Sequence, residues 1–568
     1  MLRLPLVVLG LAVAACSSTP GAGEGSSGGD HSSGTAVDPS DPTGTGVAPT
    51  SGPGTGGVET GSPDTGVGSD DSGSGDGSSS GGGHPPDPYP EPGDFPPNNG
   101  PGGPTQDFTP EQVGVECAAL DGGMPGDLGD GEEHDTFDHH NLVQMFDGYL
   151  VLPWAPEFGL NAGVTWFDFS DPCAPLAVAS VKSDEMRESH ALGFANLNDR
   201  WYMVTDEMTG LLGDGGVLFW DVTDPNAIKV VSKLELPGFL YPDAYQRVTL
   251  SVFWQAPWVY VGGADNGIYV IDASDPLKPV LAHQYKFAPV LRVGQVQVVG
   301  NLLMASAAEG KRTALLNVAK PDFPQPIAGG EFAIERESYF SNVSGGHAFY
   351  APKEGGGGLI VWDIRDPAKP KPVADYSSGG NGGYVFVKDD HAFVGESSFA
   401  TIYDISDISK PSEMLKLNLT GDLDTITPIA NVVVLSVDDK ADKDRGSIVV
   451  PWRAAADTEP PVVTWVYPPD GAEELAVFSR VGVTFNEFID IKSAWAGSVR
   501  VYQTGTDPAI TRVDGHVSTQ ENIVNFSPKE MLRPGVSYTL EIPAGGVRDY
   551  SGNPSAVAFT STFKTAGG

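Results

Sequence analysis

The sequence predicts an all-β protein in which a β-propeller of about seven four-stranded blades precedes a smaller β module. Three observations predict this fold. A strand-and-turn unit ending in Asp-Pro recurs between residues 139 and 452. Further short apolar runs accompany each unit, which gives four strand-length segments per period of about 40–55 residues. A different pattern of alternating strands begins at about residue 457.

The repeated unit is a short apolar strand that ends in Asp, followed by Asp-Pro and often a second Pro. Its copies are GVTWFDFSDPCAP (163–175), GVLFWDVTDPNAI (216–228), GIYVIDASDPLKP (267–279), GLIVWDIRDPAKP (358–370) and ATIYDISDISKP (400–411), with degenerate copies at 313–326 and 446–452. Side-chain oxygens of Asp and Ser bind nearby backbone N–H groups, and Pro stops the strand. We therefore expect the strand-ending Asp168, Asp221, Asp272, Asp363 and Asp404 to be turn residues, and we expect Trp166, Trp220 and Trp362 to pack between blades.

The last unit lacks a fourth strand, whereas QVGVECA (112–118) lies before the first unit without a partner. A ring closes when an N-terminal strand completes the last blade and so removes an exposed sheet edge. Closure of this kind would bring Cys117 beside Cys173. The chain has three cysteines. Cys16 lies in an N-terminal export and lipidation signal, described below, which leaves Cys117 and Cys173 as the two free thiols. In an exported chain these two are expected to form a disulfide. The alternative is a pair of buried free thiols.

The strand-Asp-Pro pattern resembles the LVIVD repeat of bacterial and archaeal cell-surface proteins. GIYVIDASDPLKPV matches it best, and the resemblance extends over about 310 residues. It implies a propeller and a surface location, and it implies no established reaction. The first, fourth and seventh units depart most from the pattern, so the blade number could be six or eight.

The last hundred residues resemble the bacterial Ig-like domain of S-layer and other surface proteins. The matching elements are Pro460-Pro461, Pro468-Pro469-Asp470-Gly471, the VTFNE strand, Leu532–Tyr538, and Asp549 with Gly552-Asn553. The resemblance implies an Ig-like β-sandwich that acts as a spacer or binding module. Tyr538 is expected in the core or at a corner. Asp549 and Asn553 are expected to hold a turn, with a calcium site as the alternative.

The first sixteen residues have the form of a lipoprotein signal peptide. Arg3 precedes an apolar stretch, and Val13-Ala14-Ala15-Cys16 resembles a lipobox. Cleavage before Cys16 would leave acyl chains on this residue that hold the protein on a membrane. The alternative is an ordinary signal peptide with an incidental Cys. Ser17 and Ser18 favour the outer membrane in diderm bacteria.

Residues 17–105 are expected to be a disordered tether. This segment contains 25 of the 73 glycines and only nine apolar residues, so it cannot bury enough surface to order itself. The predicted organisation is therefore a signal peptide (1–16), a tether (17–105), an LVIVD-like propeller (106–455) and an Ig-like domain (456–568).

The charge distribution excludes one class of partner. The formal net charge is −41, and residues 17–181 contain 26 acidic residues and no Lys or Arg. Nucleic-acid binding needs clustered cations that displace the counterions of the phosphate backbone, so we expect no nucleic-acid partner.

Candidate site residues come from aligning the innermost strands of the blades. Their starting positions would form a ring around one mouth of the central channel, comprising His140, His190, Arg247, Arg292, Glu337 and Asp424. His139, His140 and His190 together with the acidic residues could ligate a divalent metal. The simpler interpretation is that these histidines line a wet pore and that no cofactor is bound. Arg247 and Arg292 could hold an anionic or sugar ligand, with structural ion pairing as the alternative.

These features predict a monomeric, non-enzymatic lipoprotein of the outer membrane or cell surface, which binds an envelope protein or polysaccharide. The first alternative is an extracellular propeller enzyme that acts on a polymer, with a metal at the channel mouth. The second is a purely structural envelope component. A propeller frame hosts many functions, so the fold does not choose among them.

Overall fold

The computed structural model describes residues 100–120, 139–155, 162–184, 186, 189–207, 215–238, 249–353, 355–438 and 445–568. The predicted signal peptide, most of the predicted tether, and Arg247 lie outside these residues, as does the side chain of His139.

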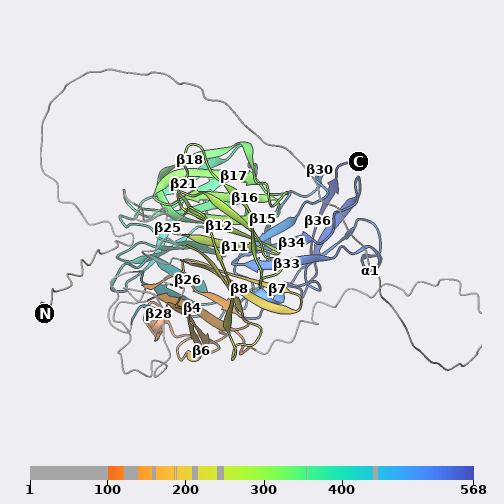
Figure 1. Cartoon of the computed structure of the whole chain (residues 1–568). Coiled ribbons are helices and arrows are strands. Elements are labelled where there is room, and N and C mark those ends of the chain that lie inside the picture. Colours follow the sequence, from red (N-terminus) through yellow and green to blue (C-terminus); the bar gives the residue numbers. More distant parts are fainter. Residues whose placement is uncertain are drawn as a thin grey trace, which may run out of the picture. The chain divides into compact units, whose positions relative to one another are not determined.

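The chain from 118 to 451 forms antiparallel sheets whose strands follow each other in chain order, which is the arrangement of a β-propeller (Figure 1). Each set of strands is one blade. The first three sets are β2 (His139–His140) and β3 (Gln144–Phe146) with β4 (Tyr149–Ala155), β5 (Gly163–Asp168) and β6 (Leu176–Lys182); then β7 (Leu192–Leu197), β8 (Arg200–Glu207), β9 (Gly216–Asp221) and β10 (Lys229–Glu235); then β11 (Ser251–Gln255), β12 (Trp258–Gly262), β13 (Ile268–Asp272) and β14 (Val280–Tyr285). The next two sets share one strand: β15 (Val293–Val299), β16 (Leu302–Ala307) and β17 (Gly310–Asn317) pair with the first half of β18 (Gln325–Ser344), and its second half continues into β19 (His347–Pro352), β20 (Leu359–Asp363) and β21 (Lys371–Tyr376). The last two sets are β22 (Val385–Lys388), β23 (His391–Gly395), β24 (Ala400–Asp404) and β25 (Ser412–Leu417); and β26 (Thr425–Ile429), β27 (Val432–Ser436) and β28 (Ser447–Pro451) with β1 (Ala118–Leu120). The number of blades in the whole chain stays a prediction.

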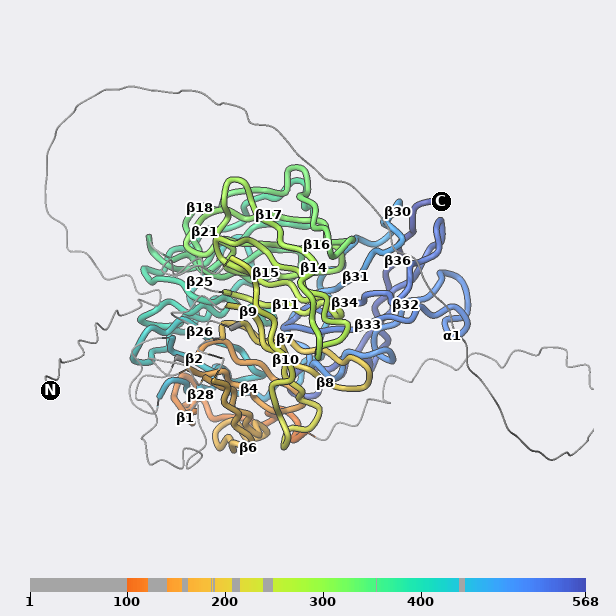
Figure 2. Tube along the Cα trace, in the orientation of Figure 1, coloured from red at the N-terminus to blue at the C-terminus, as the bar shows by residue number. Residues whose placement is uncertain are grey.

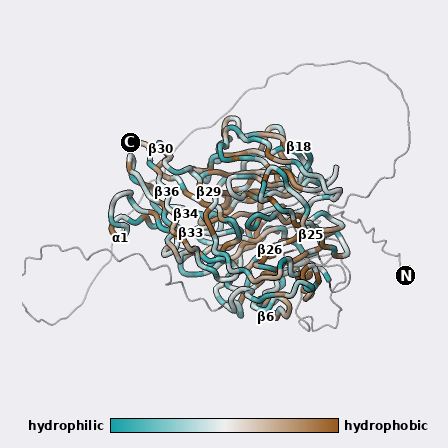
Figure 3. The backbone as a smooth tube through the Cα atoms, turned by 180° about the vertical axis from the view of Figure 1, so that it is seen from behind, coloured by the Kyte–Doolittle hydropathy of each residue, from teal (hydrophilic) through white to brown (hydrophobic). Residues whose placement is uncertain are grey.

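The long strand β18 belongs to two blades, because its first half pairs with β17 and its second half pairs with β19. The innermost strands of successive blades lie side by side around the hub, as the chain colours show in Figure 2. Hydrophobic stretches run through the strand-rich body in Figure 3. No helix in the described residues combines the length and the apolar character needed to cross a membrane.

The strand-ending aspartates are turn residues. Asp168 Oδ1 accepts hydrogen bonds from the backbone N–H (3.0 Å) and the hydroxyl (2.7 Å) of Ser170. The same bond to the residue two positions on recurs at the other copies, Asp221, Asp272, Asp363 and Asp404. These carboxylates are therefore occupied in shaping the turn after each third strand.

Aromatic residues of the repeat pack between blades, as expected. Trp166 is fully buried and meets Phe194 of the next blade with 6.5 Å between ring centroids. Trp362 stacks on Phe332 of the preceding blade at 4.5 Å. Contacts of this kind make each blade depend on its neighbours for a buried face.

The last blade is completed by the N-terminal strand β1, which pairs antiparallel with β28. The strand begins at Ala118, so it covers the end of the segment 112–118 proposed from the sequence and extends past it. Residues before it already join the seam, since the N–H of Cys117 donates to the carbonyl of Val449 at 2.9 Å. The structure joins Cys117 to Cys173 of the first blade by a disulfide that spans a sequence separation of 56 residues.

Residues 463–565 form a two-sheet sandwich. One sheet has the order β29 (Val463–Tyr467), β31 (Val481–Phe485), β34 (Ile523–Pro528), β33 (Gly515–Gln520); the other has the order β30 (Ala472–Leu475), β36 (Phe559–Thr565), β35 (Ser537–Ile542), β32 (Arg500–Gln503), and the one-turn helix α1 spans Pro508–Thr511. Tyr538 is 2% exposed in this core, and its hydroxyl accepts a hydrogen bond from the N–H of Arg533 at 2.8 Å. The sequence expectation for this tyrosine therefore agrees with its position.

Replacing both Cys117 and Cys173 with Ser is expected to lower the free energy of unfolding by about 2–4 kcal/mol, because the bridge restricts the unfolded chain over a long loop. Chemical denaturation of the two proteins without reductant measures the difference. Adding reductant should bring the wild-type protein down to the level of the double variant and leave the variant unchanged. Equal stability without reductant would show that the seam holds without the bridge.

Candidate functional site

The propeller channel has two ends that differ in their residues. At one end the innermost strands start, beside His140, His190, Arg292 and Asp424; we call this end the entry mouth. At the other end the innermost strands finish and turn outward. The Ig-like domain docks there, and in Figures 1 and 2 its strands β33 and β34 lie against β7 and β11. We call this end the Ig mouth.

His190 at the entry mouth is held by Asp206 of β8. The backbone N–H of His190 donates to Asp206 Oδ1 at 2.8 Å, and its Nδ1 lies 3.3 Å from Asp206 Oδ2. The same carboxylate accepts from the N–H of Ala191 and from the hydroxyl of Ser189. Asp206 thus fixes both the start of β7 and the orientation of the imidazole, an arrangement that a binding site or a proton-transfer site would also need.

His140 lies at the seam between the first and last blades. Its Nδ1 is 2.9 Å from Ser447 Oγ, and its backbone N–H donates to the carbonyl of Val437 at 3.0 Å. Its side chain is 1% exposed. These bonds join the two ends of the ring, so His140 has a structural task whatever else it does.

Asp424 is the buried acidic residue of the entry mouth. Burial raises the pKa of its carboxyl group well above the usual range, and the neighbouring Asp422 raises it further, while Lys353 opposes both. The Lys353 ammonium in turn lies 4.1 Å from the ring centroid of Tyr339. The mouth therefore combines a carboxyl group that tends to keep its proton with a nearby cation.

The other predicted ring residues do not join these groups. Arg292 forms ion pairs with Asp265 at 2.9 Å and Glu309 at 3.4 Å. The Glu337 side chain is exposed, and its contribution is a carbonyl that accepts from the N–H of Lys353. Tyr384 bonds to the carbonyls of both His190 and Asp424, so these two ring positions are linked through the backbone. The metal site proposed at His139, His140 and His190 stays a prediction.

Aromatic side chains fill the hub between the two mouths. Tyr339 packs against Phe340 at 4.3 Å, Phe340 stacks on Tyr384 at 3.8 Å, and Tyr384 faces Phe386 at 6.2 Å. The Tyr384 hydroxyl donates to the carbonyl of His190 at 3.0 Å. It thus links two blades that are far apart in sequence. Phe386 continues to Phe488 of the Ig-like domain at 5.6 Å.

A hairpin of the Ig-like domain enters the Ig mouth with its polar tip first. Glu521, at the turn between β33 and β34, is 2% exposed, and its Oε2 accepts from Gln297 Nε2 at 2.9 Å and from Asn342 Nδ2 at 2.8 Å. On either side of it, Gln520 bonds to the backbone of β11 and Asn522 donates to the carbonyl of Val343. Asn525 bonds to Gln255, to the N–H of Gly300 and to the carbonyl of Val298.

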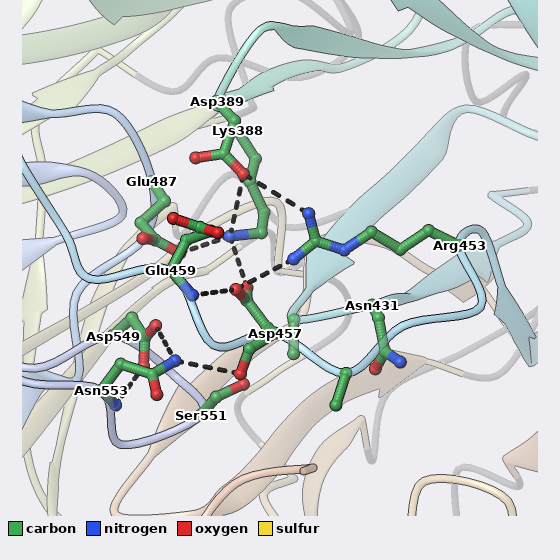
Figure 4. A network of polar contacts seen from close by, with 12 residues as sticks. Lys388, Asp389, Asn431, Arg453, Asp457, Glu459, Glu487, Asp549, Ser551 and Asn553 are labelled. Atoms are coloured by element: carbon green, nitrogen blue, oxygen red, sulfur yellow. Dashed lines mark hydrogen bonds and ion pairs between the residues drawn. The ribbon is translucent and has the colours of Figure 1, made fainter. Parts of the chain in front are cut away.

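A buried ionic cluster joins the two domains beside this hairpin (Figure 4). The Lys388 ammonium from the propeller forms ion pairs with Glu487 of the Ig-like domain and, at 2.8 Å, with Asp457 of the connecting segment. Burial lowers the pKa of Lys388, but the surrounding carboxylates outweigh this effect and keep the amine protonated. Burial also raises the pKa of Asp549 to about 6. Asp457, Glu487 and Asp549 lie close enough together to share a cation, and Lys388 supplies the positive charge that they need.

Sequence reasoning missed this interface. Gln520, Glu521 and Asn522 have the composition of an exposed hairpin turn, and nothing local distinguishes a tip that enters another domain. The turn expected at Asp549 and Asn553 does carry its own hydrogen bonds, because Asn553 bonds to both oxygens of Asp549 at 2.8 Å.

Glu521→Gln is expected to weaken the pH dependence of stability. Burial raises the pKa of Glu521 to about 7 from the ordinary 4.5. The folded protein therefore holds a proton that the unfolded chain releases. The free energy of unfolding should fall as pH rises from about 5 to 8, by on the order of 3 kcal/mol from this group. The Gln variant should lose less stability over the same interval, as urea denaturation at several pH values measures.

The matched control is Glu530→Gln, which changes an exposed residue of the same domain. It should show the wild-type pH profile, because other buried acids contribute equally to all three proteins. Identical profiles for the wild type and Glu521→Gln would contradict the burial of a titrating carboxyl group at this position.

Comparison with known protein families supports the division of the chain into a propeller and an Ig-like domain. The bacterial Ig-like domain family matches residues 457–565, and the LVIVD repeat family matches residues 256–286 and 379–418. No curated protein matches the sequence.

Solved structures with some similarity include a putative 6-phosphogluconolactonase from Bacteroides fragilis, at 13% identity over 49% of this chain and 83% of that chain, with a TM-score of 0.39. The periplasmic gluconolactonase of Pseudomonas aeruginosa has 10% identity over 54% of this chain and 85% of its own, with a TM-score of 0.41. PorZ, a surface component of the type-IX secretion system of Porphyromonas gingivalis, has 10% identity over 78% of this chain and 61% of its own, with a TM-score of 0.39. Similarity at this level says nothing of the activity of this chain.

The family matches agree with the strand topology, and both families fit a surface or extracellular protein. The chain is therefore a β-propeller protein that contains LVIVD repeats and ends in a bacterial Ig-like domain.

Proposed function

We propose that this protein is a lipid-anchored bacterial surface protein that binds an envelope protein or polysaccharide at the entry mouth of its propeller. The observation that carries the proposal is the docking of the Glu521 hairpin in the Ig mouth. A ligand approaching the channel from that side meets the Ig-like domain, so the entry mouth is the end that remains for recognition. Ligand sites are commonly concave places where a few polar groups converge, such as the mouths of β-barrels.

The chemistry of the entry mouth supports binding rather than catalysis. His190 and His140 each make bonds that fix a strand start or the seam, and Arg292 is paired with two acids. Lys353 and Arg292 carry positive charge and Asp424 keeps a protonated carboxyl group, so the mouth presents both donors and an acceptor to a polar ligand. A binding scaffold can use groups held in this way, because recognition asks only for fixed donors and acceptors.

The N-terminal sequence supports the anchoring part of the proposal. The lipobox-like Val13-Ala14-Ala15-Cys16 would place acyl chains on Cys16, and the acidic Gly/Ser-rich segment after it would hold the propeller away from the lipid. The outer membrane or cell surface is the proposed location, and a monomer is the proposed state.

The test uses the full chain expressed in a diderm bacterium, with and without Cys16→Ser. We expect the wild-type protein to incorporate a labelled fatty acid and to sediment with membranes, and the variant to do neither. The detergent-purified wild type is then applied to an array of immobilised bacterial polysaccharides and to solubilised envelope proteins. Arg292→Ala should weaken retention on the bound probe at least tenfold, since a charged hydrogen bond in a binding site contributes about 1.5–3 kcal/mol.

Arg312→Ala is the control, because Arg312 pairs with Glu331 in the body of a blade at 2.7 Å. Its retention should equal that of the wild type. Equal retention of Arg292→Ala, with an unchanged melting temperature, would place recognition away from the entry mouth.

A further inference from the structure

A pocket of about 400 Å³ lies on the same side of the propeller as the Ig-like domain. Two strand-connecting turns form its rim, one carrying Ser344 and His347 and the other carrying Asp389 and Asp390. Thr464 and Asn486 of the Ig-like domain complete the rim. Its volume falls within the range of small-molecule sites.

The floor of the pocket is apolar. Val387 and Ile405 are buried at 3% and 7% exposure, and Ile408 is half-buried beside them. Val387 comes from β22, and Ile405 and Ile408 come from the turn after β24 of the same blade, so together they form an apolar surface that a short hydrocarbon stem can cover.

Ser344 offers a polar group to this pocket. The residue is 5% exposed and lines the pocket, yet its hydroxyl makes no hydrogen bond to any residue that the structure describes. This hydroxyl group can therefore donate to or accept from a molecule that enters the pocket. Asp390 is exposed at the rim, and its carboxylate likewise makes no hydrogen bond within the described residues.

His347 and Asp389 add acceptors to the rim, whereas the Thr464 hydroxyl and the Asn486 amide donate within the protein. Nδ1 of His347 lies 3.0 Å from the carbonyl of Gly345, which can only accept, so Nδ1 carries the proton and Nε2 presents a lone pair in the neutral ring. Burial lowers the pKa of His347, which keeps the ring neutral at pH 7. Asp389 accepts from Asn486 Nδ2 at 2.7 Å through one oxygen. Its other oxygen lies 3.6 Å from Lys388 Nζ, behind the pocket wall.

We propose that this pocket binds a primary ammonium group carried on a short apolar stem. The Asp390 carboxylate, a neutral imidazole and a serine hydroxyl are available to the ligand, and no Lys or Arg lines the pocket. The Asp389 carboxylate is already engaged with Asn486, Lys388 and Arg453, so it adds acceptor character behind the rim. An ammonium group presents three donors and no acceptor, which matches a rim of acceptors. A sugar presents acceptors as well as donors and would leave several of its acceptors unanswered. The site lies away from the entry mouth and is independent of the function proposed there.

The experiment titrates the purified full-length protein with n-pentylamine at roughly physiological salt, with binding followed by ligand-observed NMR. 1-Pentanol has the same stem without the charge, and glucose is the sugar probe. We expect pentylamine to bind and both neutral probes to bind at least tenfold more weakly. Asp390→Asn should weaken pentylamine binding at least fivefold, and Ser344→Ala should weaken it about twofold to threefold.

Asp275→Asn is the matched control, because it neutralises an exposed acid on another blade of the same strongly acidic protein. It should leave pentylamine binding unchanged. Binding that is equal in Asp390→Asn and the wild type would overturn the proposal, as would glucose or 1-pentanol binding as tightly as pentylamine. Polysaccharide or envelope-protein retention at the entry mouth should be the same in Asp390→Asn and the wild type, which separates a failure of this site from a failure of the proposed function.

Discussion

The structure depends on the burial of a polar hairpin tip inside the propeller. Glu521 is enclosed at the Ig mouth with Gln297 and Asn342 as its donors. A buried carboxyl group without partners would be costly, so the two domains keep one relative position that satisfies it. Gln520, Asn522 and Asn525 impose the same requirement on neighbouring backbone groups. The Ig-like domain is thus a separate domain in sequence, but its hairpin is bonded into one end of the propeller channel.

The ring itself depends on contacts between its two ends. The strand β1 completes the last blade, the Cys117–Cys173 bridge crosses the seam, and His140 bonds to Ser447 of the last blade. An open ring would expose an unpaired strand edge, and such an edge tends to pair with other chains. Closing the ring also fixes the entry mouth, since His190 and Asp424 keep their positions only while the blades remain in register.

The propeller could be predicted from the sequence because its signal is local and repeated. Each strand-Asp-Pro unit contains its own turn chemistry, and the structure shows the same Asp-to-backbone bond at each copy. For the candidate ring, the sequence could predict which residues start the innermost strands, but not which partners hold their side chains. Which partner holds His190 depends on Asp206, which lies on the next strand and has no signature of its own. The Glu521 hairpin and the Lys388 cluster could not be predicted, because they join residues more than a hundred positions apart or from different domains through contacts with no periodic pattern.

Hydrogen exchange of the full-length chain tests the docking of the hairpin most directly. Backbone amides from Ser518 to Asn525 should exchange at least a hundredfold more slowly than those of the exposed turn at Gly505 and Thr506, because the hairpin lies between two domains. Exchange at the tip as fast as at that turn would contradict a docked hairpin, because it would mean that the Ig-like domain swings free of the channel.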